Sequence, residues 1–223
     1  MKDKLKKSRF LGIEIKPLKN QSITIVNDAN ELFLIIGKVI PKFFDGVWSY
    51  DEELYDTPSE IRFPDDKLDW SAYIDSSEKI VLLAFREDAC VGQIRLVKDW
   101  NRFAYIENIA VRSNFRKTGV GHLLLEAAET WAKEHSLIGL SLEAQNDNLI
   151  ACRFYAKEGF VLGGVDTLKQ SANFQIDIIL YWYKIFPKLK DLPMNKDELI
   201  ALAEQMSIDE YVYDETTRVK GAV

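Results

Sequence analysis

The order of hydrophobic runs between residues 80 and 185 is the feature that most restricts what this chain can fold into. Ile80 to Phe85 and Cys90 to Val97 are apolar, β-rich runs joined by four residues, which predicts a hairpin. Ala104 to Val111 predicts a third strand. An amphipathic helix is expected next, because apolar residues then recur at i, i+3 and i+4 spacing. Its predicted inner face comprises Val120, Leu123, Leu124, Ala127, Ala128 and Trp131.

The alternation of strand and helix patterns continues along the chain. Leu137 to Ala144 predicts a strand, and Asn148 to Lys157 predicts a short helix that Gly159 ends as a left-handed C-cap. The last strands are expected at Phe160 to Leu162 and Phe174 to Ile185. Antiparallel strands followed by strand, helix, strand, helix and strand predict an α/β layered domain with a mixed sheet.

The remaining parts of the chain carry weaker signals. Its 223 residues suffice for one large domain, expected at 11–186 after a flexible tail at 1–10. A C-terminal helical extension is expected at 187–223, with an amphipathic helix at 195–204. This helix could pack on the sheet or on a second subunit, so a homodimer stays an open alternative.

The region before residue 80 is expected to hold one helix and a broken segment. Leu32 to Ile40 is an apolar run that predicts a helix ending before Pro41. Pro58 and Pro64 are expected to divide the following segment into short pieces.

The negative charge of the chain is concentrated in one segment. The formal net charge is −6, yet residues 45–75 alone carry −8 and the rest of the chain carries +2. An acidic chain does not favour non-specific nucleic-acid binding, which depends on an excess of Lys and Arg. A local acidic surface suits a cationic ligand instead. The alternative is a solvated loop that only keeps the protein soluble.

No targeting or membrane signal is evident. The basic start of the chain lacks the apolar run of a secretory signal, and the longest apolar stretches, such as Leu32 to Ile36, are shorter than the ~20 residues of a membrane helix. The expected location is the cytoplasm, with no membrane partner. Cys90 and Cys152 cannot form a disulfide framework. A nucleophilic Cys152 is disfavoured, because only His122 and His135 could serve it.

The segment Arg116-Lys117-Thr118-Gly119-Val120-Gly121 carries the clearest chemistry. It lies where a strand leads into a helix, so glycines allow a ligand to approach and free N–H groups point outward. The helix dipole and these donors favour an anion such as a pyrophosphate. The segment lacks the order of a Walker loop and the first glycine of the dinucleotide fingerprint. A plain helix start rich in small residues is the alternative.

Two signatures resemble those of GNAT-type N-acetyltransferases. The pattern R-x-x-G-x-G follows a strand that ends in Ile109-Ala110-Val111, as in the acetyl-coenzyme A signature of that family. Downstream, N-D-N-L-I-A-C-R-F-Y-A-K-E-G-F is similar to the second signature of the family. The resemblance implies a mixed, mostly antiparallel sheet flanked by helices, with strands that splay at an acetyl-CoA site. It implies acetyl-CoA as co-substrate and no metal.

A finer resemblance extends over roughly residues 31–186. The segments I-I-G-K-V-I-P-K, W-N-R-F-A-Y-I-E-N-I-A-V and G-G-V-D-T-L-K-Q-S-A-N-F-Q resemble the streptothricin (nourseothricin) acetyltransferases. This resemblance implies acetyl transfer to a β-lysine amine of streptothricin-class antibiotics, and therefore antibiotic resistance. Acetyltransferases of another small polyamine or of an aminoglycoside, and a non-catalytic acetyl-CoA-binding regulatory protein, remain alternatives.

The resemblance assigns residues to the acetyl-CoA site. Backbone groups of Ile109, Ala110 and Val111 would bind the pantetheine arm, and the Val111 N–H would polarise the thioester carbonyl. The turn would hold the pyrophosphate through Arg116, Lys117, Thr118, Gly119, Val120 and Gly121. Asn148 would contact the pantetheine arm, although an N-cap role for this residue is compatible with that contact.

Two residues are candidates for proton transfer. Tyr155 lies seven residues after Asn148 on one helix face and would protonate the departing thiolate; a core tyrosine is the alternative. Glu107 is an acid among apolar strand residues, and we expect it to accept the proton of the attacking amine, directly or through water. It lies four residues before Val111, so the two side chains are expected to point the same way. An ion-paired strand acid is its alternative role.

A cationic substrate would require acidic and aromatic groups. Tyr105 and Glu143 are on strands expected to face each other. The aromatic and acidic residues interleaved in the acidic segment would contact ammonium groups by cation–π and ionic interactions. These candidates are Trp48, Tyr50, Asp51, Glu52, Glu53, Tyr55 and Asp56.

Overall fold

The computed structural model describes residues 12–173 and 176–186. The expected tail at 1–10 and the expected extension at 187–223, with its helix at 195–204, lie outside the described residues. The chain divides into two compact units, Met1–Ile185 and Phe186–Val223, and all elements described below belong to the first. Among the described residues, no helix is long and apolar enough to cross a membrane.

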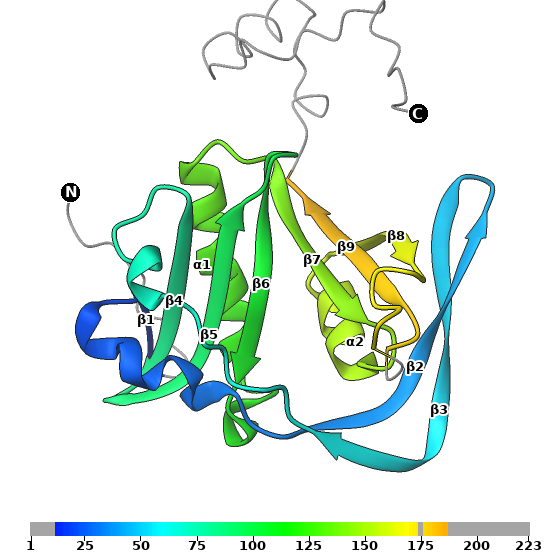
Figure 1. Cartoon of the computed structure of the whole chain (residues 1–223), viewed down its shortest axis with the longest axis horizontal. Coiled ribbons are helices and arrows are strands. Elements are labelled where there is room, and N and C mark those ends of the chain that lie inside the picture. The colour runs from blue at the N-terminus through cyan, green and yellow to red at the C-terminus, as the bar shows by residue number, and fades with distance from the viewer. Residues whose placement is uncertain (1–11, 174–175, 187–223) are drawn as a thin grey trace, which may run out of the picture. The chain divides into compact units, whose positions relative to one another are not determined.

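A seven-stranded sheet forms the centre of the first unit (Figure 1). Its strands are β1 (Ile13–Pro17), β4 (Lys79–Arg86), β5 (Ala89–Lys98), β6 (Phe103–Val111), β7 (Gly139–Gln145), β8 (Val161–Asp166) and β9 (Ile179–Ile185). They lie in the order β1-β4-β5-β6-β7-β9-β8, and every neighbouring pair is antiparallel except β6–β7. The expected mixed, mostly antiparallel sheet and its β4–β5 hairpin are confirmed.

Helix α1 (Val120–Glu134) packs closely on one face of this sheet. A Cβ atom at Gly92 of β5 would come within 3.1 Å of side-chain atoms of Val120 and Leu124, so the absence of a side chain here favours this close approach. The predicted inner face is correct in four of its six positions, because Leu123 and Ala127 are only half-buried. The buried residues of α1 are Val120, Leu124, Leu125, Ala128, Trp131 and Ala132.

Short 3-10 segments cover the opposite face of β4 and β5. These are η1 (Asn20–Ala29) and η2 (Trp70–Tyr73). Their buried cluster consists of Leu18, Val26, Tyr73, Val81, Leu83 and Cys90. Leu82 and Ala84, which alternate with these residues along β4, are buried as well. Strand β4 is therefore covered on both faces, which explains its continuous apolar sequence.

The prediction of a helix at Leu32 to Ile40 is wrong. These residues belong to β2 (Phe33–Phe44), which pairs with β3 (Val47–Ile61) as a separate two-stranded ribbon. Burial alternates with period two through Ile35, Gly37 and Val39, as in a strand. Pro41 is tolerated because its nitrogen lies on the edge of β2 turned away from β3, the edge on which Val39, two residues earlier, donates to the Asn146 carbonyl.

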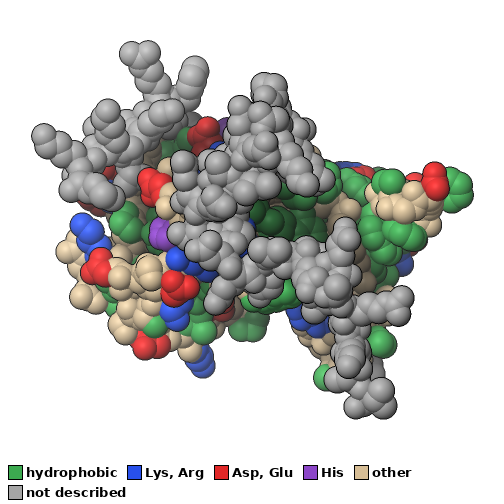
Figure 2. Space-filling model, turned by 90° about the horizontal axis from the view of Figure 1, so that it is seen from above, with side chains coloured by type: hydrophobic (Ala, Val, Ile, Leu, Met, Phe, Trp, Pro, Cys, Tyr) green, Lys and Arg blue, Asp and Glu red, His purple; other side chains and the backbone are tan. Residues whose placement is uncertain are grey.

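The expected division of the acidic segment by Pro58 is wrong for the strand itself, because Pro58 lies within the 15 residues of β3. The pairing with β2 is nevertheless interrupted there: the register passes from Gly37–Leu54 to Ile35–Ser59 and leaves residues 55–58 without a partner on β2. The far end of the ribbon exposes large hydrophobic side chains, and Figure 2 shows such side chains gathered on the right of the view. They include Phe43, Phe44 and Val47.

Candidate active site

Strands β6 and β7 diverge in the middle of the sheet. They pair only between Phe103–Ile106 and Gly139–Leu142, whereas β6 remains paired with β5 as far as Val111. Figure 1 shows the two strands separating along their length. From Glu107 onward, the β7-facing edge of β6 has no strand partner. This gap is the splay that the sequence resemblance implied.

The pairing of β6 with β5 determines which backbone groups face the gap. The Arg112 N–H donates to the Val91 carbonyl at 2.9 Å, next to the pair formed by Val111 and Gly92. In an antiparallel ladder, the inter-strand hydrogen bonds on either side of such a pair come from neighbouring residues. The pair itself directs its N–H and C=O groups away from the partner strand. The backbone groups of Val111, and of Ile109 two residues earlier, therefore face the gap. Ala110 directs its backbone groups toward β5.

The turn before α1 has the geometry of an anion site. It follows η3 (Ser113–Phe115), and Gly119, the N-cap of α1, has φ 97° and no side-chain cap. The first N–H groups of the helix therefore lack an intrahelical or capping partner. A Cβ atom at Gly121 would lie 3.0 Å from the Phe154 ring, so a side chain here would crowd that ring.

The two cations of this turn differ in role. The Arg116 guanidinium donates to the Val111 carbonyl at 2.9 Å and to the Leu32 carbonyl at 2.7 Å. It thereby ties the loop just before β2 to the end of β6. Lys117 is exposed and has φ 62°, so its charge is available to an anion in front of the turn. Thr118 donates its hydroxyl to the Phe115 carbonyl at 2.6 Å and stabilises the turn.

Glu107 is the extra residue of a β-bulge. The register passes from Leu96–Ile106 to Arg95–Asn108, which leaves Glu107 without a partner on β5. The expectation that Glu107 and Val111 point the same way is wrong, because the bulge shifts the alternation between them. Val111 pairs with Gly92, which contacts α1, whereas Glu107 faces η2 on the other side of the sheet.

Two donors hold the Glu107 carboxylate. Its Oε2 accepts from the Tyr73 hydroxyl at 2.7 Å and from Arg95 Nε at 3.0 Å. Arg95 is almost fully buried and also donates to Asp66 Oδ2 at 2.6 Å, beneath the Trp70 ring. Burial, followed by the hydrogen bond to Glu107, raises the pKa of Tyr73, which therefore stays a donor. Glu107 is thus ion-paired, which is the alternative role expected from the sequence. Its side chain is still 27% exposed.

Tyr155 lies on the helix-covered side of the sheet. Helix α2 (Leu149–Lys157) begins at Asn148, whose Oδ1 accepts from the Ala151 N–H at 3.3 Å, so Asn148 is an N-cap. The Tyr155 ring is buried, with the rings of Phe160 and Trp182 centred 5.8 and 6.4 Å away. Burial raises the pKa of its phenol, so the hydroxyl keeps its proton at neutral pH.

Tyr105 and Glu143 do come together. They line one small cavity on the same face of the sheet as Glu107. Burial and then the charge of Glu143 raise the pKa of Tyr105. The Glu143 carboxylate is paired with Lys169 of the β8–β9 loop.

The acidic residues of β3 lie apart from Glu107. Asp51 pairs with Lys42, Glu53 with Lys38, and Glu52 with Arg153 of α2. The contact between Arg153 Nε and Glu52 Oε1 measures 3.0 Å. These acids therefore already have cationic partners within the chain.

The aromatic candidates of β3 fall into two groups. Trp48 packs on Phe43 of the ribbon, and Tyr50 contacts Trp182 beside α2, with centroids 5.7 Å apart. Burial raises the pKa of the Tyr55 phenol, which the charge of Lys38 opposes and that of Asp147, just after β7, reinforces. Asp56, the next residue, is exposed.

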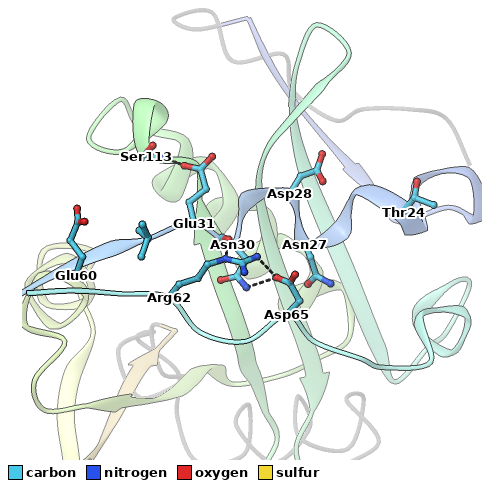
Figure 3. Close-up of a pocket in the computed structure, with 10 residues that line it drawn as sticks. Thr24, Asn27, Asp28, Asn30, Glu31, Glu60, Arg62, Asp65 and Ser113 are labelled. Atoms are coloured by element: carbon cyan, nitrogen blue, oxygen red, sulfur yellow. Dashed lines mark hydrogen bonds and ion pairs between the residues drawn. The ribbon is translucent and has the colours of Figure 1, made fainter.

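A larger groove of about 910 Å³ opens beside the end of β6 (Figure 3). Its acidic residues come from η1, the loop before β2, β3 and the loop after β3. Asn30 and Arg62 both donate to Asp65 Oδ1, at 2.8 and 2.6 Å. Glu31 accepts from the Ser113 N–H at 2.6 Å and thereby joins the groove to the turn before α1. The sequence analysis missed this groove, because its residues are brought together only by tertiary contacts.

Sequence reasoning also missed the partners of Glu107. Arg95 had a signal, since it is the only charged residue in the run Cys90 to Val97. A charge in a strand buried on both faces requires a partner of opposite charge. Tyr73 and Asp66 had no comparable signal.

Comparison with known proteins places this geometry in one family. The model of the acetyltransferase (GNAT) family matches residues 41–160. Streptothricin acetyltransferase A of Bacillus subtilis is 43% identical over 162 residues, which cover 72% of this chain and 92% of that protein. A streptothricin acetyltransferase of Escherichia coli is 43% identical over 102 residues, covering 45% of this chain and 59% of that protein.

Solved structures agree with these matches. A protein of Bacillus anthracis, assigned as a streptothricin acetyltransferase and crystallised with acetyl coenzyme A, superposes with a TM-score of 0.71 at 31% identity. The superposition covers 80% of this chain and all of that one. A nourseothricin acetyltransferase shares the fold, with a TM-score of 0.66 at 23% identity over 78% of this chain and 99% of that one. The chain therefore belongs to the acetyltransferase (GNAT) family, and is an acetyl-CoA-dependent N-acetyltransferase related to the streptothricin acetyltransferases.

Proposed function

We propose that the protein transfers an acetyl group from acetyl-CoA to the β-lysine amine of streptothricin-class antibiotics and so confers resistance to them. One observation carries this proposal. Over 162 aligned residues, the chain is 43% identical to a relative named streptothricin acetyltransferase A and covers 92% of it. The acidic groups on the Glu107 face support it, because the acceptor would be cationic.

The residues around the gap fit acetyl-CoA. The free N–H groups at Gly119 to Gly121, with exposed Lys117 beside them, suit a pyrophosphate. The N–H groups of Ile109 and Val111 suit an amide-bearing arm, because no strand satisfies them. Asn148 would contact that arm only through the part of its side chain not used in capping. When bound, acetyl-CoA supplies the acetyl group as a thioester.

The two faces of the sheet suit different halves of the reaction. Glu107 faces the side of η2, where an ammonium group would lose its proton to the carboxylate through a water molecule. The Val111 N–H points into the gap and would donate to the carbonyl oxygen under attack. Tyr155 lies on the helix side and would give its phenolic proton to the departing sulfur. The splay connects the two sides.

Acetyl-CoA turnover with nourseothricin, followed by mass spectrometry of the product, tests the substrate. Growth of a sensitive host expressing the protein tests resistance. Glu107→Gln and Tyr155→Phe should each lower kcat, by ~10²-fold or more for the first. Absence of turnover and of protection by the wild type would refute the substrate, and a panel with a polyamine and an aminoglycoside would then identify the amine. Full activity of both variants would refute the assigned roles.

A further inference from the structure

The small cavity beside Tyr105 has features of a cation site that the proposed chemistry does not yet use. It measures about 120 Å³ and opens between β6, β7 and β9. That is roughly four water volumes, which suits the end of an aminoalkyl chain. Its lining includes Asp99, Tyr105, Ser141, Glu143, Tyr181 and Tyr183, and has two carboxylates and no basic residue.

Ser141 gives independent evidence that a ligand belongs in this cavity. Ser141 is 5% exposed, and its Oγ is buried without a hydrogen-bond partner among the described residues. A buried hydroxyl without a partner is unfavourable. Because Ser141 lines the cavity, an N–H donor entering there lies next to this oxygen and would satisfy it once the lining atoms shift to expose it.

A cation of the chain itself already lies beside the cavity. The Lys169 ammonium is paired with Glu143, and it lies 5.6 Å from the centroid of the Tyr181 ring. The hydrogen bond to Glu143 raises the pKa of Lys169, so this side chain remains charged. Carboxylate and aromatic ring together are the groups that recognise an ammonium ion.

The Lys169 side chain can leave without its loop unfolding. Asp166 Oδ1 accepts from the Leu168 and Lys169 N–H groups, at 2.8 and 2.9 Å, and fixes the backbone there. Asp166 Oδ2 accepts from the Tyr181 hydroxyl at 3.3 Å. The Lys169 side chain is 42% exposed, and exposed ion pairs are weak. Exchange of Lys169 for another ammonium group would therefore cost little.

We propose that this cavity binds a second ammonium group of the acceptor, and that Lys169 is an internal competitor which that group displaces from Glu143. The inference rests on the proposed function, since it assumes a cationic acceptor. Tyr105 precedes Glu107 by two residues, which along a strand is about 7 Å. The preferred acceptor is thus a diamine, with one amine beside Glu107 and the other against Glu143 and Ser141.

Steady-state kinetics with streptothricin tests the site. Lys169→Gln should lower the KM for the acceptor about threefold, and Glu143→Gln should raise it about tenfold, with the KM for acetyl-CoA unchanged in both. Lys16→Gln is the matched control, because Lys16 also pairs with a glutamate, Glu14, and lies 5.6 Å from an aromatic ring. Acceptor KM values equal to that of Lys16→Gln in both variants would overturn the proposal.

Ser141→Ala distinguishes a binding role from a structural one. Removing a buried hydroxyl that has no partner should leave the melting temperature unchanged or higher. The same variant should raise the acceptor KM about threefold, because the entering ammonium group loses an acceptor. A lower melting temperature together with an unchanged KM would contradict this role.

Titration with simple amines separates this inference from the proposed function. If the wild type does not acetylate streptothricin, 1,4-diaminobutane and 1-aminobutane are titrated into the full chain and followed by NMR. Tighter binding of the diamine, strengthened by Lys169→Gln and weakened by Glu143→Gln, would support the cation site alone. Equal affinities across the wild type and these variants would refute it.

Discussion

Glu107 shows how one residue can be both ion-paired and available for chemistry. The bulge removes it from the β5 register, so its side chain is directed by Tyr73 and Arg95 rather than by strand alternation. Both of these donors bind Oε2. A carboxylate with one oxygen anchored and a partly exposed side chain can bind a water molecule with its other oxygen.

Tyr73→Phe should weaken this positioning without removing the carboxylate. The ring would keep its place in the buried cluster, while Oε2 would lose the donor at 2.7 Å. We expect kcat to fall about three- to tenfold with the KM for acetyl-CoA unchanged, and the pH profile of kcat/KM to shift. A profile that superimposes on that of the wild type would show that Tyr73 has only a packing role.

Cys152 should be chemically inert in the folded protein. Burial raises the pKa of its thiol from 9.0 to about 12, with the charge of Asp147 as the next cause. At pH 8 the thiolate fraction is on the order of 10⁻⁴. We expect Cys152→Ala to retain acetyl transfer, and iodoacetamide to modify the native protein far more slowly than the protein in urea. Loss of turnover in a stably folded Cys152→Ala would contradict this.

The same shift makes stability depend on alkaline pH. Because the pKa of Cys152 is raised in the folded state, its contribution to the free energy of unfolding is complete below pH 9 and is lost as pH rises toward 12. The melting temperature should therefore fall more between pH 8 and 10.5 in the wild type than in Cys152→Ala. Equal decreases in the two proteins would argue against the shift.

At the scale of elements, the glycine turn before α1 offers the sharpest test. Gly119 has φ 97° and Gly46, in the β2–β3 turn, has φ 76°. Alanine at either position should cost stability, about 1 kcal/mol, since L residues disfavour this backbone region. Only Gly119→Ala should also raise the KM for acetyl-CoA, measured by thiol release. If both variants have the same KM for acetyl-CoA, the turn is not part of the co-substrate site.

The elements also show how far the sequence could predict this structure. The order from β4 to β9 followed from hydrophobic periodicity, and the glycine turn from its motif. The ribbon was missed because an apolar run such as Leu32 to Ile40 suits a helix or a strand, and only pairing with β3 decides between them. The bulge at Glu107 is a property of register, which involves residues of two strands and is not visible in either one.

For the candidate site, the sequence located the turn, the gap and the acids, but not their partners. Lys169, Arg95 and Tyr73 are 26, 12 and 34 residues away from the acids they bind. Pairings over such separations follow from the arrangement of the sheet. An acid in the sequence therefore indicates that a charge is present, and the fold determines whether it is already neutralised.

At the scale of the whole first unit, half of the ten acids in the acidic segment are paired with basic residues of the chain. Asp51, Glu52, Glu53, Asp65 and Asp66 each pair with a basic residue. The field of this segment is consequently weaker than its formal charge of −8 suggests. Its effect on a cationic acceptor should be long-range and sensitive to salt.

Neutralising the β3 acids tests that field. The variant carrying Asp51→Asn, Glu52→Gln, Glu53→Gln and Asp56→Asn should raise the acceptor KM several-fold at low ionic strength, with the KM for acetyl-CoA nearly unchanged. The difference should shrink in about 0.5 M salt, where charges are screened within a few ångströms. Glu87→Gln with Asp88→Asn, in the β4–β5 turn, is the control. If the variant and the wild type have equal acceptor KM values at both salt concentrations, the acidic segment is only a solvated surface.

The splay between β6 and β7 has a consequence for how the sheet holds together. Four residue pairs alone join β1-β4-β5-β6 to β7-β9-β8 within the described sheet. The backbone amides of Ile109 and Val111 should therefore exchange with solvent deuterium faster than their neighbours on β5. A ligand lying in the gap would supply the missing hydrogen-bond partners, slow that exchange and couple the two halves. The bound co-substrate would then contribute to the stability of the fold, and the free energy of unfolding would increase as the co-substrate concentration rises.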